Sequence, residues 1–138
     1  MPEKDPEHWL YRLTSDEWLS AAENELCSSR TAFLHKQQRP AVAHARRAAG
    51  MAWNAVLCLA PDERYGRSYM EHLQALSQDS VVAPELRAAA GRLVAMPLAP
   101  ELVTLGAHGD PSQADPAALI LEYARSLLRG RQPASEPA

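Results

Sequence analysis

The segment from Arg39 to Pro61, RPAVAHARRAAGMAWNAVLCLAP, constrains the fold more than any other part of the chain. Pro40 is suited to the first position of a helix, where its missing N–H costs nothing, and Pro61 is suited to end one. Between the two prolines, apolar residues recur at steps of three and four, as they do on one face of an α-helix. This face consists of Val42, Ala45, Ala49, Ala52, Trp53, Val56 and Ala60. The pattern predicts a long helix whose alanine-lined face packs closely against a neighbour.

Further helical patterns stand on both sides of this segment. The sequence Thr14-Ser15-Asp16-Glu17 has the form of a capping box, which starts a helix predicted to run to about Gln37. Its inner stripe is predicted to consist of Trp18, Ala22, Leu26, Ser29 and Phe33. Later helices are predicted over residues 67–78, from Pro84 to Met96, and from Asp115, which is expected to cap a helix with Pro116 at its first position.

Composition supports a helical domain. The hydrophobic share of 46% is mostly alanine and leucine, with one phenylalanine, and this mixture favours packed helices over sheets. We therefore predict an all-α fold, an up-and-down bundle of four to five helices, in a single domain over residues 14–129. Residues 1–13 are expected to form a lead-in segment that folds back on the bundle through Trp9, Leu10 and Leu13. Residues 130–138 are expected to form a disordered tail.

The cellular setting is predicted from the absence of targeting signals. No stretch approaches the ~20 apolar residues that a membrane span needs, and the acidic start lacks the features of a signal peptide. A cytoplasmic protein without membrane contact is expected, and the preference for arginine over lysine indicates a bacterial gene. Cys27 and Cys58 are predicted to be free, buried thiols, because the antiparallel arrangement of their helices keeps them apart.

The charge distribution is uneven although the net charge is only −3. Residues 1–29 carry seven acidic and two basic groups, whereas residues 30–60 carry five basic groups and no acidic one. Antiparallel pairing of the first two helices is expected to bring Arg30 level with Arg46 and Arg47. We call the predicted surface the basic tip; it consists of Arg30, Lys36, Arg39, Arg46 and Arg47, with His35 and His44 beside them. Such a surface suits a phosphate, an RNA backbone or an acidic protein, and alternatively its side chains are merely solvated or paired with carboxylates of another helix.

A second hypothesis concerns the spacing of Arg39 and His44. The two residues are separated by four others, an Arg-x4-His spacing. They stand at the start of the second predicted helix, where the free N–H groups of Ala41 to Ala43 are expected to favour an anion.

The remaining candidates for chemistry are weaker. His72 borders an apolar stripe and is predicted to be a packing residue, whereas His8 and His108 have no companion at metal-ligand spacing. The sequence Arg64-Tyr65-Gly66-Arg67 is predicted to be a turn, with an exposed Tyr65 that stacks on a base as the alternative. No zinc, di-iron or phosphate-loop motif is present, so we expect neither a metal site nor a cofactor.

The order of these parts resembles the HEPN family, the higher-eukaryote-and-prokaryote nucleotide-binding helical bundles. The resemblance rests on EWLSAAENEL, RRAAGMAWNAVL, SYMEHLQAL and ADPAALILEYARSLL, which together span most of residues 14–129. It implies a homodimeric bundle that is either a metal-independent ribonuclease or an inactive partner. The nuclease members carry an Arg, a spacer of four to six residues and a His late in the bundle, where the Arg offsets phosphate charge and the His acts as acid or base. Here no His follows Arg87, Arg92, Arg125 or Arg129 at that distance, and the spacing of Arg39 and His44 fits the pattern at an earlier place in the chain.

Three functions therefore follow as hypotheses. The preferred one is a non-catalytic HEPN-like interaction module that uses the basic tip, as one half of a two-component pair with a nucleotidyltransferase or an antitoxin. RNA or a nucleotide is the alternative ligand of the same surface. The second hypothesis is a toxin-like ribonuclease that uses Arg39 and His44 across a dimer, and the third is a structural subunit that oligomerises through Trp9 to Leu13.

Overall fold

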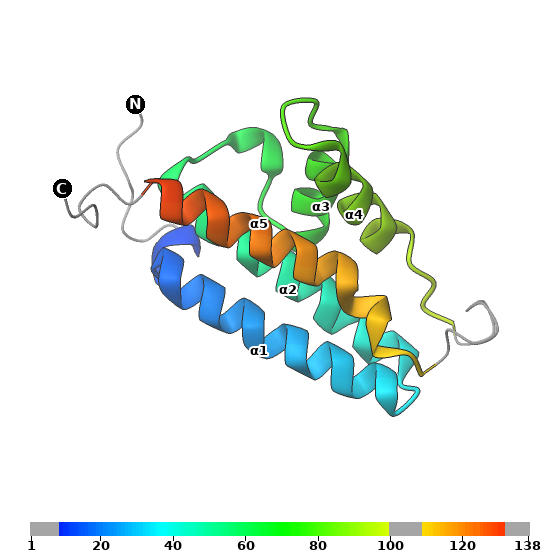
Figure 1. The fold of residues 1–138 in the computed structure, drawn as a ribbon. Coiled ribbons are helices and arrows are strands. Elements are labelled where there is room, and N and C mark those ends of the chain that lie inside the picture. Colours follow the sequence, from blue (N-terminus) through cyan, green and yellow to red (C-terminus); the bar gives the residue numbers. More distant parts are fainter. Residues whose placement is uncertain (1–8, 100–108, 132–138) are drawn as a thin grey trace.

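Helix α2 (Gln38–Leu59) is the central element of the fold, with α1 and α5 packed along it (Figure 1). The computed structural model describes residues 9–99 and 109–131, and every regular element in these ranges is helical. The prediction of an all-α bundle is confirmed. Around α2 lie α1 (Ser15–Leu34), α3 (Tyr69–Gln78), α4 (Pro84–Ala95), α5 (Asp115–Arg131) and the short 3-10 helices η1 (Trp9–Arg12), η2 (Glu63–Tyr65) and η4 (Pro111–Ala114).

Helix α1 begins where the sequence predicted and ends earlier. The backbone N–H of Thr14 donates to Glu17 Oε1 at 2.9 Å, and the N–H of Glu17 donates to Thr14 Oγ1 at 3.2 Å, so the capping box is confirmed. The helix stops at Leu34 because the chain turns at residues 35–37, where Lys36 adopts a left-handed backbone with φ 59°. Helix α2 therefore starts at Gln38, and Pro40 is its third residue instead of its first.

This early turn fixes a different register between α1 and α2 from the one predicted. Ser15 Oγ donates to the carbonyl of Ala55 at 2.9 Å, and Ser29 Oγ donates to the carbonyl of Ala41 at 2.8 Å. Arg30 thus lies level with the start of α2, and its predicted alignment with Arg46 and Arg47 is wrong. The predicted anion site at the start of α2 is also wrong, because the N–H of Ala41 already donates to Gln37 O within the helix.

The predicted inner faces of α1 and α2 are buried, except that Ala60 is half-buried. Helix α2 also buries residues outside that stripe, including Ala41, Ala48 and Ala55, because it has neighbours on more than one side. A Cβ atom at Gly50 would lie 2.3 Å from Tyr69 Cδ1, so the glycine allows α3 to approach α2 closely. The sequence predicted one buried face on α2, whereas this helix is buried on more than one side.

The segment before α1 belongs to the core. Leu10 is buried, and its carbonyl accepts a hydrogen bond from Trp18 Nε1 at 2.9 Å and one from Cys58 Sγ at 3.5 Å. The prediction that Leu10 and Leu13 fold back on the bundle is confirmed, since Leu13 also packs against the core. Leu10 therefore packs inside its own chain, and this argues against the hypothesis that Leu10 mediates oligomerisation.

The two cysteines differ in exposure. Both are free, but Cys27 is exposed and Cys58 is buried, so the prediction of two buried thiols is wrong for Cys27. Cys27 lies outside the inner stripe of α1, which explains its exposure.

The later part of the chain follows the predicted order. Helix α4 starts at Pro84 as predicted, and α5 includes Asp115 as its first residue and extends through Gly130 to Arg131, two residues into the expected tail. His8, His108 and residues 132–138 lie outside the described residues. Within residues 9–99 and 109–131, no helix combines the length and the apolar character needed to cross a bilayer.

Candidate functional site

The α1–α2 turn carries the most exposed members of the basic tip. His35, Lys36 and Arg39 are exposed, and the structure shows no hydrogen bond or ion pair from Lys36 or Arg39 side chains to any other described residue. Arg30 is 43% exposed, and its Nη2 lies 3.9 Å from Asp115 Oδ1 at the start of α5. These side chains can meet a ligand without breaking a buried contact, since the one ion pair among them is long and exposed.

Arg46 has a different environment, because it turns toward the end of α4. Its Nε donates to the carbonyl of Leu93 at 2.9 Å, and its Nη2 donates to the carbonyls of Val94 at 3.1 Å and Met96 at 3.4 Å. The last carbonyls of a helix have no partner within it and carry the negative end of the helix dipole, so a guanidinium stabilises them. Burial lowers the pKa of Arg46. Arg46 therefore joins α2 to α4 and is not part of the exposed basic tip.

Arg47 and His44 share a carboxylate of α1. Glu25 Oε2 lies 2.5 Å from His44 Nδ1, and Glu25 Oε1 lies 3.4 Å from Arg47 Nη1. The Glu25 side chain is 19% exposed, that of His44 28% and that of Arg47 44%. Tyr69 is also nearby: burial, and secondly the charge of Glu25, raises the pKa of its phenol. The structure thus assembles an acid, an imidazole and a guanidinium at one place on the α1–α2 surface.

The predicted pair of Arg39 and His44 is not assembled within one chain. Five residues advance an α-helix by about 140° beyond a full turn, so the two side chains lie on different faces of α2. Arg39 is exposed near the turn, whereas His44 faces Glu25 of α1. In the described chain, the arginine next to His44 is Arg47.

The loop after α2 corrects the interpretation of Tyr65 as an exposed stacking residue. Tyr65 is only 4% exposed, and its ring centroid lies 5.8 Å from that of Trp53. Its hydroxyl donates to Asp79 Oδ2 at 2.6 Å, across the 14 residues that include α3. Burial and this hydrogen bond raise the pKa of Tyr65.

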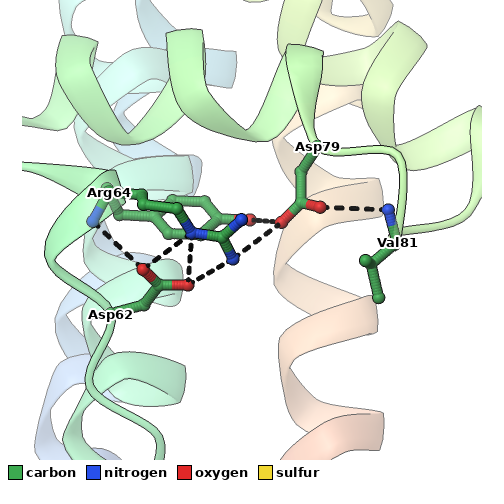
Figure 2. Close-up of polar contacts among 5 residues, drawn as sticks. Asp62, Arg64, Asp79 and Val81 are labelled. Atoms are coloured by element: carbon green, nitrogen blue, oxygen red, sulfur yellow. Dashed lines mark hydrogen bonds and ion pairs between the residues drawn. The ribbon is translucent and has the colours of Figure 1, made fainter.

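Around Tyr65 lies a polar group that sequence analysis missed, which we call the Tyr65 cluster: Asp62, Arg64, Tyr65 and Asp79. Figure 2 shows the Arg64 guanidinium between the carboxylates of Asp62 and Asp79. Arg64 Nη2 lies 2.6 Å from Asp62 Oδ2 and 4.0 Å from Asp79 Oδ2, and the backbone N–H of Val81 donates to Asp79 Oδ1 at 3.0 Å. The hydrogen bond from Arg64 lowers the pKa of Asp62, and the hydrogen bond from Tyr65 lowers the pKa of Asp79. Both carboxylates are therefore ionised at neutral pH.

His72 is a packing residue, as predicted. It is fully buried, with Nδ1 2.6 Å from the carbonyl of Tyr65 and Nε2 2.7 Å from the side-chain amide of Asn54. Burial lowers the pKa of His72, so the neutral ring is favoured; it donates through Nδ1 and accepts at Nε2. Asn54 Nδ2 has no acceptor within the described residues, and an amide turned so that its NH₂ faces Nε2 gives both groups a partner.

Neither the described side chains nor known proteins assign a chemistry to these sites. In the described ranges, no three His, Cys, Asp or Glu side chains are grouped so that they could hold a metal ion. Comparison with protein-family models, with curated proteins and with solved structures finds no match.

Proposed function

We propose that this protein is a non-catalytic, HEPN-like interaction module that binds an acidic partner through the part of the basic tip that lies at the α1–α2 turn, Arg30, Lys36 and Arg39. The observation that carries the proposal is the exposure of Lys36 and Arg39 without a carboxylate partner among the described residues. Both lie at the end of a hairpin held by buried hydrogen bonds, such as that from Ser29 to Ala41. A rigid element that presents cations in this way loses little entropy when it binds.

The acidic partner that suits this surface is a protein. Three exposed cations near one turn, with Asp115 beside Arg30, form a small and partly compensated patch. Polynucleotide binding draws on many phosphate contacts, and a net charge of −3 opposes it, whereas a protein partner needs only a few complementary charges. We therefore favour a protein encoded beside this chain, a nucleotidyltransferase or an antitoxin, over RNA.

A binding experiment with charge reversal tests this proposal. The double variant Lys36→Glu/Arg39→Glu should weaken binding of the neighbouring gene product about tenfold at low salt, with less effect at high salt, because exposed ion pairs are screened. The double variant Arg92→Glu/Arg129→Glu makes the same change of charge at exposed positions of α4 and α5 and should bind like wild type. Equal affinities for the two double variants would reject the basic tip as the contact surface.

One observation favours a second function, a metal-independent ribonuclease. The 2.5 Å contact between Glu25 and His44 Nδ1 orients the imidazole, whose Nε2 has no partner among the described residues and can transfer a proton. Arg47, which pairs with the same carboxylate, can offset phosphate charge. The pair of Arg39 and His44 that the sequence predicts needs a second copy of the chain, because the two side chains lie on different faces of α2. Incubation with RNA in the presence of a chelator should show cleavage that His44→Ala abolishes. If the wild-type protein does not cleave RNA, the ribonuclease function is rejected.

A further inference from the structure

Lys36 has a backbone conformation that is unfavourable for a lysine. Its φ is 59°, and within the described residues it is the only residue other than glycine with a positive φ. In this left-handed region the side chain of an L-residue crowds its own backbone, whereas glycine adopts the conformation readily. Strained backbone conformations are concentrated at functional positions, so a lysine here points to a role for its side chain.

The hydrogen bonds around Lys36 form a helix end in which glycine is the usual residue. The N–H of Gln37 donates to the carbonyl of Ala32, and the N–H of Lys36 donates to that of Phe33, both at 2.9 Å. This pair of hydrogen bonds is the Schellman motif, and Lys36 occupies the position that usually holds glycine. The turn would therefore form with glycine as well, and its hydrogen bonds do not explain the lysine.

The side chain of Lys36 is held along its stem and open to a ligand at its end. A Cβ atom added at Gly109 would lie 3.3 Å from both Cγ and Cε of Lys36, so the stem runs against that backbone. The acidic residues that follow are already engaged, Asp110 by a backbone N–H and Asp115 by Arg30. The structure shows no carboxylate of a described residue paired with the Lys36 ammonium group.

An apolar side chain stands beside this lysine in the chain. Leu34, the last residue of α1, is 59% exposed, and Arg39 on the other side of Lys36 is also exposed. The turn thus presents an apolar group together with two cations. A protein segment that carries carboxylates next to an apolar residue matches both, because protein interfaces combine apolar contacts with complementary charge at their rim. The phosphates of RNA match only the cations.

We propose that Lys36 is the principal contact residue of the basic tip, and that it binds an acidic segment of the partner protein whose apolar side chain packs on Leu34. This inference rests on the proposed function and specifies the part of the partner that is recognised. Lys36 then lowers stability and raises affinity. A variant that relieves the strain should gain stability and lose affinity, a combination that a purely structural lysine would not give.

Nuclear magnetic resonance titration with an acidic peptide tests the site. The probe is an octapeptide in which two leucines separate three pairs of glutamate, and it should shift the backbone amide resonances of residues 34–39 saturably at low salt. The same peptide with serine in place of leucine should bind about fivefold more weakly, because it offers no apolar group to Leu34. Octauridylate, which has a similar charge, should also bind more weakly. Absence of saturable shifts, equal binding of the two peptides, or tighter binding of octauridylate overturns the proposal.

Two variants of Lys36 separate the charge from the strain. Lys36→Gly should raise the midpoint of thermal unfolding by about 2 °C, because glycine relieves the strain, and should weaken binding of the leucine peptide about fivefold. Lys36→Met keeps the stem against Gly109 but loses the charge, and it should weaken binding by a similar factor. A Lys36→Gly variant that binds like wild type, or that is less stable than wild type, overturns the proposal.

The matched control is Arg129→Met, which removes one positive charge at an exposed position of α5 and should leave the affinity for the leucine peptide unchanged. An equal loss of affinity in Arg129→Met and Lys36→Met overturns the proposal. Binding of the neighbouring gene product separates this inference from the proposed function. If Lys36→Glu/Arg39→Glu loses affinity and Lys36→Gly does not, the proposed function stands and the role of Lys36 is rejected. If the double variant keeps its affinity, both are rejected.

Discussion

The basic tip and the Tyr65 cluster differ in whether their charged side chains come together in the structure. The basic tip was predicted as one surface and is divided among several partners, whereas the Tyr65 cluster was not predicted and forms one group. The five cations of the basic tip lie within 18 positions of the chain, yet Arg30, Arg46 and Arg47 pair with α5, α4 and α1, and Lys36 and Arg39 have no partner among the described residues. The Tyr65 cluster instead joins Asp62 and Asp79, which belong to separate turns, through Arg64 and Tyr65. Both sets span 18 positions of the chain, so nearness in sequence does not decide whether charged side chains form one group. The return of the chain after α3 brings Asp79 back to Arg64 and Tyr65, whereas no such return gathers the basic tip.

The contrast shows that register and the neighbouring backbone decide the role of a charged side chain. Arg46 and Arg47 are adjacent in sequence, but one caps the end of α4 and the other pairs with Glu25 of α1. The following variants test how far the two regions differ, from the largest expected effect to the smallest.

Removal of the Tyr65 side chain should have the largest effect. Tyr65→Ala deletes a buried ring that contacts Trp53, and the free energy of unfolding should fall by about 3 kcal/mol, as for other buried aromatic truncations. Chemical denaturation measures the change, and Arg67→Ala, at an exposed position of the same loop, should stay within about 0.5 kcal/mol of wild type. A loss below about 1 kcal/mol for Tyr65→Ala would mean that the cluster contributes little to the fold.

Replacement of Arg46 should have the second largest effect on stability. Arg46→Met removes hydrogen bonds to three carbonyls at the end of α4, and the free energy of unfolding should fall by about 2 kcal/mol. Amide hydrogen exchange should become faster at the end of α4 in particular. Arg39→Met makes the same substitution at an exposed site and should change stability by less than about 0.5 kcal/mol. Equal losses of stability in Arg46→Met and Arg39→Met would contradict the different roles that we assign to these two arginines.

The dependence of stability on pH should reveal the buried His72 beside the Tyr65 cluster. Because burial lowers the pKa of His72 in the folded state, unfolding takes up a proton below its ordinary value of 6.5. Stability is full above that pH and falls as the pH drops toward the folded pKa, with a slope of at most about 1.4 kcal/mol per pH unit for one group. Denaturation from pH 8 to pH 5 should show a steeper loss in wild type than in His72→Gln, and parallel curves would contradict this assignment.

The smallest of these effects concerns a single hydroxyl. Tyr65→Phe removes the hydrogen bond to Asp79 but keeps the ring, so the cost should be about 1 kcal/mol. The pKa of Asp79 should rise toward its ordinary value, because that hydrogen bond is the main cause of its lowering. The stability that wild type loses in acid as Asp79 protonates should then be smaller in the variant. An unchanged carboxyl titration of Asp79 would disprove the role of the hydroxyl.

Local patterns predicted the helices because helix signals act within a few residues. The Thr14 and Glu17 capping box and the apolar stripe of α1 needed no knowledge of the rest of the chain. The same stripe excludes Cys27, so its exposure was readable from the sequence although we predicted burial. A capping box between Ser68 and Glu71 likewise marks the true start of α3, two residues after the predicted one.

The sites were less predictable because they depend on distances between helices. The turn at residues 35–37 moved the register of α2 by several residues, and this shift placed Glu25 next to His44 and Arg47. No local pattern indicates that Arg46 reaches the carbonyl of Leu93, 47 positions away, or that Tyr65 is buried. Both follow from how α3 and α4 return to α2.

We propose that Arg39 serves binding and Arg46 serves folding, and this distinction is tested most directly by measuring stability and binding in variants of both residues. Arg39→Met and Arg46→Met should be compared for thermal stability and for affinity toward the neighbouring gene product. Arg39→Met should weaken binding at unchanged stability, whereas Arg46→Met should lower stability and, where still folded, bind like wild type. The reverse pattern, or equal effects of the two variants on both quantities, would contradict it.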